Sequence, residues 1–350
     1  MRLIYNCNSF SKFVKRIPHI LNINNYKHIL IVRLSSLGDI LLTTPLVRSL
    51  KKQNPQLQID FLVRSEYSDL LKFNPHISSL FLFSRNEEEN KKLKIKLMEM
   101  KYDCVIDLQN NLRSKLFLNN IPSESFSFNK KRFEKALLVH LKINLLRDAQ
   151  QIPVRYAETI PSFRLDNEGL ELFLPENISA GIPHGQNIIG LCPGARHFTK
   201  RWQKENFIQL GKILNEEGFS VALFGGKSDK ELCEEILKEI AGSIDLSTND
   251  DILQLAKDMQ QCKAIVCNDS GLMHAACAVK VPVVAIYGST VREFGFTPYG
   301  CKNIILENNS LTCRPCSHIG RKKCPQKHFR CMLELTPRQA FESIIKVLKQ

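Results

Sequence analysis

The sequence lacks any apolar run of the about 18–20 residues that a transmembrane helix needs. Its first 21 residues include basic and apolar side chains, but they contain neither a continuous apolar core nor a small-residue cleavage site, which argues against a secretory signal peptide. We therefore expect residues 1–26 to form an N-terminal extension, either irregular or folded as an amphipathic helix that touches a membrane surface.

Acidic residues are scarce relative to basic ones. The 350 residues include 49 Lys and Arg but 35 Asp and Glu, so the formal net charge is +14. This excess indicates anionic partners such as nucleic acid, phosphorylated sugars or an acidic membrane surface. A nucleic-acid-binding protein would gather its cations on one face with aromatic residues between them. Because the cations here follow strand ends and form scattered patches, we expect no nucleic-acid partner.

The chain also lacks internal repeats and low-complexity segments, and apolar strands alternate with helices in two successive halves. Strands are expected at residues 28–34, 58–63, 79–83 and 104–108, and again at 187–191, 220–224, 264–267 and 283–287. Such runs are typical of parallel sheets covered by helices on both faces. A stretch rich in Pro, Gly and polar residues at 175–186 predicts a linker. The sequence therefore predicts an α/β fold of two doubly wound halves, with ligands bound between them at the carboxyl ends of the strands.

A single carboxylate, Asp39, follows a turn of small residues after the first expected strand. Aspartate at this place is suited to cap the helix expected at 39–54. It is also suited to act as a general base, because a sugar hydroxyl needs a carboxylate within hydrogen-bond reach to accept its proton. Ser35 and Ser36 add hydroxyl groups to the same turn, and Gly38 lets a ligand approach the backbone.

The segment 268–274, Asn-Asp-Ser-Gly-Leu-Met-His, repeats the strand–turn–helix pattern in the second half. The unpaired N–H groups and positive dipole end of such a helix suit a diphosphate, and Ser270 and Gly271 are small enough to let one approach. Asp269 either bonds to a ribose or sugar hydroxyl or caps the helix. His274 either contacts the ligand or packs as a core histidine.

Two further loops leave strand ends in the second half. In one of them, Gly194 permits close approach, and Thr199 and Lys200 would present a hydroxyl and a cation to phosphates. The other loop holds Gly225 and Asp229 and would complete a nucleotide pocket. The loops match neither the Walker pattern nor the dinucleotide glycine fingerprint, which disfavours ATPase and dehydrogenase functions.

Polar and basic residues follow strands of the first half as well. Arg64 follows one expected strand, and Gln109 and Arg113 follow another, so these residues are candidates for binding an anionic acceptor. The basic segment 130–135 lies next to three phenylalanines. It is either a solvated helix face or a contact for phosphorylated lipid headgroups.

Cysteine is plentiful, with twelve residues of two kinds. Cys104, Cys192, Cys267 and Cys277 stand in apolar surroundings and are expected to be buried thiols in a reducing compartment. A second group lies near the C-terminus with two histidines nearby, and its candidate zinc ligands are Cys313, Cys316, Cys324 and Cys331. Their spacing is looser than in a zinc ribbon, so a structural zinc, free thiols and a disulfide formed on oxidation all stay open.

In four motifs the chain resembles glycosyltransferase family 9, the ADP-heptose–lipopolysaccharide heptosyltransferases. The motifs are Arg33–Asp39, Tyr102–Gln109, Pro193–Ala195 with Lys200–Trp202, and Asn268–His274, and the match runs from about residue 27 to the end. The resemblance implies a GT-B fold. It places an acceptor-binding Rossmann-like domain at 27–175, a nucleotide-sugar-binding one at 187–335, and a C-terminal helix at 336–350 that crosses back to the first domain.

The resemblance also implies an activity, the inverting and metal-independent transfer of a heptose from an ADP-heptose donor to the lipopolysaccharide inner core. In such enzymes the acid after the first glycine is the base, which corresponds to Asp39. The lysine two residues before the tryptophan holds the diphosphate, which corresponds to Lys200. The Asp-Ser-Gly turn that begins at Asp269 grips the phosphates and the sugar, and an acid near the third loop, here Asp229, contacts the nucleoside.

Partners and location follow from the same resemblance. We expect an anionic, lipid-linked saccharide acceptor that ends in Kdo or heptose, no cofactor for catalysis, and a monomer in the cytoplasm that associates peripherally with the inner leaflet of the inner membrane. Two alternatives stay open: a related transferase that uses another nucleotide-sugar, and a non-catalytic nucleotide-sugar-binding protein. The presence of Asp39 argues against the second alternative.

Overall fold

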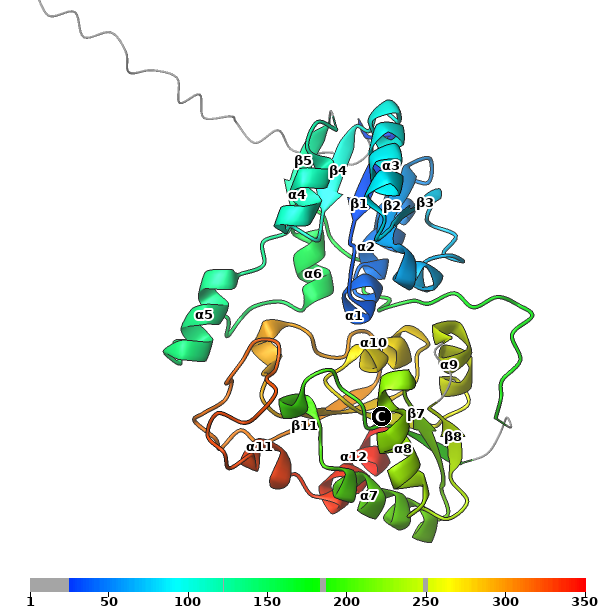
Figure 1. Ribbon diagram of the computed structural model, residues 1–350, viewed down its shortest axis with the longest axis vertical. Coiled ribbons are helices and arrows are strands. Elements are labelled where there is room, and N and C mark those ends of the chain that lie inside the picture. Colours follow the sequence, from blue (N-terminus) through cyan, green and yellow to red (C-terminus); the bar gives the residue numbers. More distant parts are fainter. Residues whose placement is uncertain (1–24, 122, 183–186, 248–250) are drawn as a thin grey trace, which may run out of the picture.

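The computed structural model describes residues 25–121, 123–182, 187–247 and 251–350, and its two halves each contain a parallel sheet (Figure 1). In the first sheet the strand order is β3-β2-β1-β4-β5, and every neighbouring pair is parallel. Its strands are β1 (His28–Val32), β2 (Gln58–Arg64), β3 (Ser79–Phe83), β4 (Cys104–Asp107) and β5 (Glu124–Ser127). The central strand β1 is apolar on both faces because Ile29 and Ile31 pack into one core cluster while Leu30 and Val32 pack into another.

The second sheet has six strands in the order β11-β10-β9-β6-β7-β8, and it too is parallel throughout. Its strands are β6 (Ile188–Cys192), β7 (Ser220–Phe224), β8 (Ile244–Leu246), β9 (Ala264–Asn268), β10 (Val283–Tyr287) and β11 (Asn303–Glu307). The predicted fold of two doubly wound α/β halves is therefore confirmed. The four cysteines expected inside the core are buried as well.

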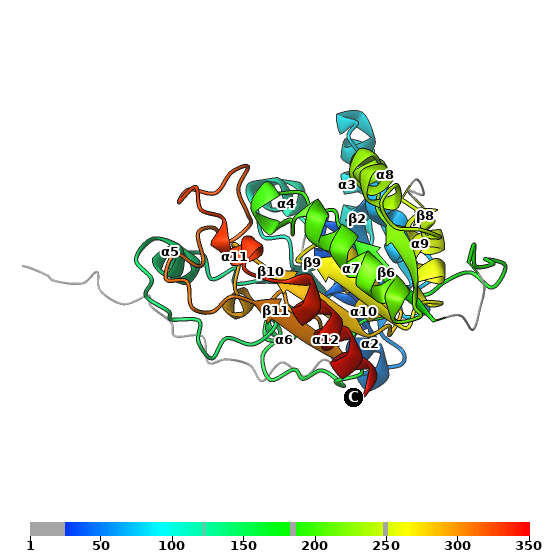
Figure 2. The same ribbon diagram turned by 90° about the horizontal axis from the view of Figure 1, so that it is seen from below.

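Helices cover both sheets (Figures 1 and 2). In the first half they are α1 (Leu37–Leu41), α2 (Thr44–Gln53), α3 (Glu87–Glu99), α4 (Leu112–Leu118), α5 (Arg132–His140) and α6 (Ile152–Ala157). In the second half they are α7 (Lys204–Glu216), α8 (Lys230–Leu237), α9 (Ile252–Met259), α10 (Gly271–Ala278), α11 (Arg330–Leu333) and α12 (Pro337–Leu348). The helix expected at 39–54 is split into α1 and α2, and Asp39 lies inside the first turn of α1.

The C-terminal helix α12 packs on the second half, against α7 and the strands β9, β10 and β11. Its side chains Phe341, Ile344 and Val347 belong to the same core cluster as Trp202. The indole nitrogen of Trp202 donates a hydrogen bond to the carbonyl oxygen of Leu335, 2.9 Å away and just before this helix. The expectation that residues 336–350 cross back to the first domain is therefore wrong. An amphipathic stripe predicts that a helix packs, but it does not say on which sheet.

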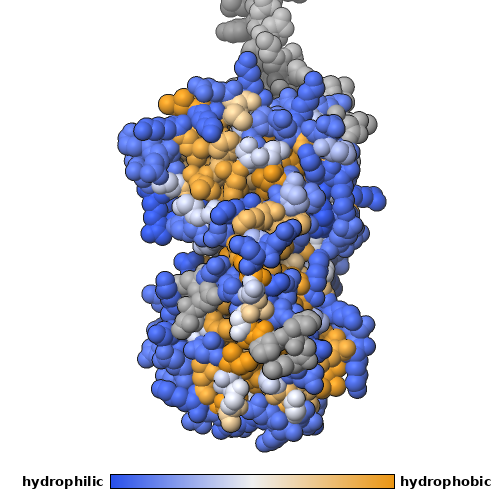
Figure 3. Space-filling view, turned by 90° about the vertical axis from the view of Figure 1, so that its right-hand side faces the viewer, coloured by the Kyte–Doolittle hydropathy of each residue, from blue (hydrophilic) through white to orange (hydrophobic). Residues whose placement is uncertain are grey.

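The two halves meet where α1 faces α10. A Cβ atom added to Gly38 would lie 2.5 Å from Cδ2 of His274, and one added to Gly271 would lie 3.2 Å from Cδ2 of Leu37. Glycine at both positions therefore lets the two helices approach closely. The space-filling view shows the molecule narrowing between the halves (Figure 3). The expected N-terminal extension falls almost entirely outside the described residues.

Candidate active site

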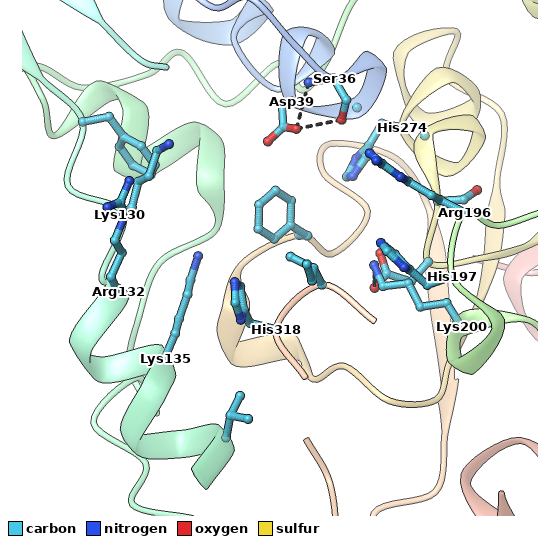
Figure 4. Close-up of a pocket in the computed structure, with 18 of the residues that line it drawn as sticks. Ser36, Asp39, Lys130, Arg132, Lys135, Arg196, His197, Lys200, His274 and His318 are labelled. Carbon is cyan, nitrogen blue, oxygen red and sulfur yellow. Dashed lines mark hydrogen bonds and ion pairs between the residues drawn. The ribbon is translucent and has the colours of Figure 1, made fainter. Parts of the chain in front are cut away.

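A cavity of about 710 Å³ lies between the two halves, beyond the carboxyl ends of β1, β6 and β9. Its walls include the turn and helix α1 after β1, the loop after β6, the start of α10, and α5 with the segment 318–319 (Figure 4). This is the crevice in which doubly wound folds bind their ligands.

Asp39 enters this cavity from α1 and also caps that helix. Its Oδ2 atom accepts hydrogen bonds from the backbone nitrogen of Ser36 at 3.1 Å and from the Ser36 hydroxyl at 2.9 Å (Figure 4). Its Oδ1 atom lies 2.5 Å from Nη2 of Arg33. The two roles weighed for Asp39, helix cap and site carboxylate, are therefore compatible in one geometry.

Arg33, which directly follows β1, holds the Asp39 carboxylate in place through this ion pair. The guanidinium is buried, donates from Nη1 to the carbonyl oxygen of Leu108 at 2.6 Å, and lies over the ring of Tyr156 with 5.7 Å to the ring centre. The sequence motifs include Arg33 but do not assign it a role. A charged side chain in an otherwise apolar strand was the available signal, because a buried cation needs a partner.

The second half supplies a cation and a carboxylate to the opposite wall. Nζ of Lys200 lies 2.6 Å from Oδ2 of Asp269, and the Thr290 hydroxyl donates to the same oxygen at 2.7 Å. This arrangement fixes the lysine at the start of α10, where backbone N–H groups and the helix dipole favour negative charge.

Two polar atoms beside Lys200 are buried and lack a hydrogen-bond partner among the described residues: the Ser270 hydroxyl and Nδ1 of His274. Burial lowers the pKa of His274 to about 4, so the imidazole is neutral near pH 7. Buried polar groups normally find a partner. Both residues line the cavity, and a ligand rich in oxygen atoms bound there is a candidate partner for these atoms.

A third wall is strongly basic. Lys130, Arg132 and Lys135 reach the cavity from α5 and the residues before it, and Arg196 adds a cation on the opposite side, next to His274 (Figure 4). Burial, together with the neighbouring Arg155, lowers the pKa of Lys135 to about 8. The wall is therefore suited to an anionic group in the same cavity as Asp39.

Eight of the predicted site residues line the cavity: Ser36, Gly38, Asp39, Lys200, Asp269, Ser270, Gly271 and His274. Eight others do not line it: Ser35, Arg64, Gln109, Arg113, Gly194, Thr199, Gly225 and Asp229. The cavity is also lined by residues that were not predicted as site residues, among them Arg33, Tyr156, Arg196, His197 and His318.

The residues outside the cavity mostly have structural partners. Oε1 of Gln109 accepts hydrogen bonds from the backbone nitrogens of Leu34 and Ser35 at 2.9 and 3.2 Å, so it supports the turn that carries Asp39. Arg64 pairs with Glu66 at 2.9 Å. The Thr199 hydroxyl accepts a hydrogen bond from the backbone nitrogen of Arg321 at 2.8 Å.

Gly194 and Asp229, which do not line the cavity, lie against each other. A Cβ atom on Gly194 would lie 2.4 Å from the Asp229 carboxylate, so the loops after β6 and β7 touch at this point. Asp229 also accepts a hydrogen bond from the backbone nitrogen of Gly226 at 3.3 Å. Glycine at 194 is therefore needed for this contact between the two loops.

The four candidate zinc ligands near the C-terminus are close enough to interact electrostatically, since Cys313, Cys316 and Cys324 all act on Cys331. Within the described ranges, no group of three or more His, Cys, Asp or Glu side chains is placed to hold a metal ion, and the eleven cysteines there are free. Sγ of Cys313 lies 3.8 Å from Nε2 of His328. The predicted zinc site is not confirmed.

In the described part of the chain, every helix is too short or too polar to span a bilayer.

Two doubly wound halves with a cavity between them are the architecture of the GT-B fold. Residues 91–328 match the model of glycosyltransferase family 9 (heptosyltransferase). The chain therefore belongs to glycosyltransferase family 9, as the motifs predict, and is an enzyme of sugar transfer.

Individual relatives agree with this assignment. Lipopolysaccharide heptosyltransferase 2 of Salmonella typhimurium is 29% identical over 92% of this chain and 99% of the relative. The solved structure of E. coli ADP-heptose lps heptosyltransferase II is 26% identical, with a TM-score of 0.67 over 92% of this chain and 99% of that one. A glycosyl transferase family 9 structure from Veillonella parvula, 21% identical, has the same fold, with a TM-score of 0.76 over 94% of this chain and 99% of that one.

Proposed function

We propose that this protein transfers a heptose from ADP-heptose to the inner core of lipopolysaccharide. The observation that carries the proposal is the placement of one carboxylate, Asp39, across a single cavity from the Lys200–Asp269 pair and the start of α10. A base on one wall and an anion-binding helix start on the other are what a displacement at an activated sugar requires. The names of the relatives support heptose as the sugar and ADP as its carrier.

The proposed reaction is a single displacement with inversion. Asp39 accepts the proton of an acceptor hydroxyl while that oxygen forms a bond to the anomeric carbon of the heptose. The bond between the anomeric carbon and the diphosphate oxygen breaks, and its electron pair leaves with ADP. Attack from the face opposite to the leaving group inverts the anomeric configuration.

Lys200 and the first N–H groups of α10 would stabilise the charge that grows on the departing diphosphate. Asp269 and Thr290 fix the position of the lysine, and the unpaired Ser270 hydroxyl adds a donor. We propose that these groups supply the charge compensation that a metal ion provides in other transferases, so that transfer needs no cofactor. Gly194, Thr199, Gly225 and Asp229 stay predictions for the outer part of the donor site.

The acceptor would bind against the basic wall of the first half. Lys130, Arg132 and Lys135 suit the carboxylate or phosphate groups of a Kdo- or heptose-terminated inner core. We propose that the acceptor contacts come from α5 and the residue Lys130 before it, because the predicted contacts Arg64, Gln109 and Arg113 do not line the cavity. We further propose that the enzyme acts as a cytoplasmic monomer at the inner leaflet, where such a lipid-linked acceptor is found.

The test is a transfer assay with ADP-heptose and a truncated lipopolysaccharide from which the outermost heptose of the inner core is missing. The product is read by mass spectrometry. Wild type should add one heptose. Asp39→Asn should lose about 10²–10⁴ in rate, because it keeps the shape of the side chain but cannot accept the proton. Normal transfer by this variant would remove Asp39 from the proposed role.

Binding separates this proposal from its two alternatives. Both wild type and Asp39→Asn should be stabilised against thermal unfolding by ADP-heptose more than by GDP- or UDP-sugars. Stabilisation by ADP-heptose without any transfer by wild type would favour a non-catalytic binding protein. Stabilisation by another nucleotide-sugar alone would favour a related transferase.

A further inference from the structure

We propose that α5 with the loop after it, and the segment 318–323 beside it, form a surface that docks on an anionic lipid bilayer. We call residues 130–147 the arm. The inference rests on the proposed function, because a lipid-linked acceptor would bring the enzyme to a membrane. It adds the part of the molecule that makes the contact and the chemistry of the surface that it fits.

The arm has two apolar faces, and only one of them is used inside the protein. Leu138 and Val139 are buried in a small cluster with Phe294 of the second half. Phe133 and Leu141, in contrast, are 69% and 63% exposed. They lie eight residues apart, so they share one side of α5 and the residue after it. The exposed pair is therefore not part of the core.

The exposed apolar surface continues beyond the helix. Ile143 and Leu145 follow Leu141 at alternate positions and are also exposed. Ile319 is exposed in the segment beside the arm. Large exposed apolar residues gathered in one region, unlike single scattered ones, mark an interaction surface.

Basic residues surround these apolar side chains. Residues 130–147 contain six Lys and Arg and a single acidic residue, Glu134. Residues 313–330 contain no Asp or Glu and six Lys and Arg, of which Arg314 is buried and pairs with Glu307. Arg321, Lys322 and Lys323 are exposed beside Ile319. Apolar side chains ringed by Lys and Arg complement the anionic headgroups and the acyl boundary of a bilayer.

The two segments are joined to each other and border the cavity. Nζ of Lys142 donates to the carbonyl oxygens of Cys313 and Pro315 at 3.0 and 2.6 Å. His318 lines the cavity across from Lys135 (Figure 4). Two views at right angles place α5 at one edge of the molecule, near α11 and the segment that precedes it (Figures 1 and 2). A bilayer against this surface would present a lipid-linked saccharide next to the basic wall.

Vesicle sedimentation with the full-length protein tests the surface. Wild type should bind vesicles of phosphatidylethanolamine and phosphatidylglycerol, and should not bind vesicles of phosphatidylcholine. Phe133→Ser/Leu141→Ser should weaken binding by about tenfold or more. Lys322→Gln/Lys323→Gln should weaken it by about fivefold for each cation.

Matched controls come from the far end of the first half. Leu82→Ser/Ile95→Ser replaces two apolar residues of β3 and α3 that are 46% and 59% exposed, and Lys92→Gln/Lys101→Gln removes two exposed cations. Both control variants should bind as wild type does. Equal vesicle binding by the arm variants and their controls would overturn the proposal.

A fluorescence measurement tests the same surface with a variant that keeps a large apolar side chain at position 133. Trp202 is the only tryptophan and is buried, so the emission change of Phe133→Trp reports on the arm. Anionic vesicles should shift this emission to shorter wavelength. Vesicle binding without any shift would mean adhesion of a basic surface to a polyanion, as to a nucleic acid, and would overturn docking through apolar side chains.

Transfer to a detergent-dispersed acceptor separates this inference from the proposed function. Phe133→Ser/Leu141→Ser should transfer heptose to the dispersed acceptor at the wild-type rate and to acceptor in vesicles more slowly. Equal rates on both acceptors for this variant would overturn the docking surface alone. A wild type that binds vesicles as expected but transfers no heptose to dispersed acceptor would overturn the proposed function alone.

Discussion

Arg33 and Asp39 form an ion pair across the turn between β1 and α1, with 2.5 Å between Nη2 and Oδ1. Ser36 holds the second carboxylate oxygen through its backbone nitrogen and its hydroxyl. The carboxylate is therefore oriented by three donors before any substrate arrives. Such orientation reduces the cost of reaching the reactive geometry, provided that one lone pair stays open to the acceptor hydroxyl.

Arg33 is expected to act as a positioning residue for this carboxylate. Arg33→Met should lower kcat by about tenfold or more with little change in KM, because the carboxylate loses the donor that orients it. Arg33→Lys should restore part of the lost rate. The measurement is steady-state kcat and KM for the three proteins. A change confined to KM would contradict this role.

Lys200 is expected to contribute mainly to the rate. Lys200→Met should lower kcat by about 10²–10³, because one charge contact to the leaving diphosphate is lost. Lys204→Met is a matched control, since Lys204 is exposed in α7 and pairs with Glu235 outside the cavity. Steady-state kinetics with ADP-heptose measures both variants. A Lys200→Met enzyme with wild-type kcat would show that the lysine does not stabilise the leaving group.

His274 is expected to make folding sensitive to acid. Burial lowers its pKa to about 4 from an ordinary value of 6.5, so the unfolded chain binds the proton more readily between these pH values. The free energy of unfolding should therefore fall as the pH drops from about 6.5 to about 4, by up to roughly 3 kcal/mol from this group.

The measurement is urea unfolding at several pH values for wild type and His274→Gln. The variant lacks the titrating group, so its stability should decline less between pH 6.5 and pH 4. Parallel curves for the two proteins would mean that His274 is protonated equally in the folded and unfolded chains.

Gly38 is expected to tolerate no side chain. Gly38→Ala would place Cβ 2.5 Å from the His274 ring, which must then shift and separate α1 from α10. We expect a loss of about 1–3 kcal/mol in the free energy of unfolding, together with slower transfer. Gly271→Ala meets a side-chain methyl of Leu37 at 3.2 Å and should be milder. Denaturant unfolding of both variants measures the difference, and a milder effect at Gly38 would reverse the expectation.

Much of the fold could be predicted because its central strands are apolar on both faces. The strands β1, β2, β6, β7, β9 and β10 all lie where near-continuous apolar runs occur. The edge strands β5 and β8, with sequences ESFS and IDL, are short and only partly buried, so periodicity does not reveal them. The sheet on which α12 packs is decided by shape complementarity between distant segments. The amphipathic pattern of the helix alone does not specify it.

Site residues could be predicted from the sequence only where a polar or charged side chain lies in a turn after a strand. Asp39, Ser270 and Lys200 lie in motifs at strand ends, and all three line the cavity. Gln109 follows a strand in the same way but turns toward the backbone of Leu34, a choice that the sequence does not reveal. Arg33 directly follows β1, where the run of apolar residues predicts core rather than an ion pair with the base.

Trp202 is buried in the second half, packs edge-on against Phe207 and bonds to Leu335. As the only tryptophan of the chain, it gives the molecule an optical reporter for that half alone. When emission and far-ultraviolet dichroism are followed together during denaturation, the first signal tracks one half and the second tracks both. A gap between the two transitions would thus measure how independently the halves melt.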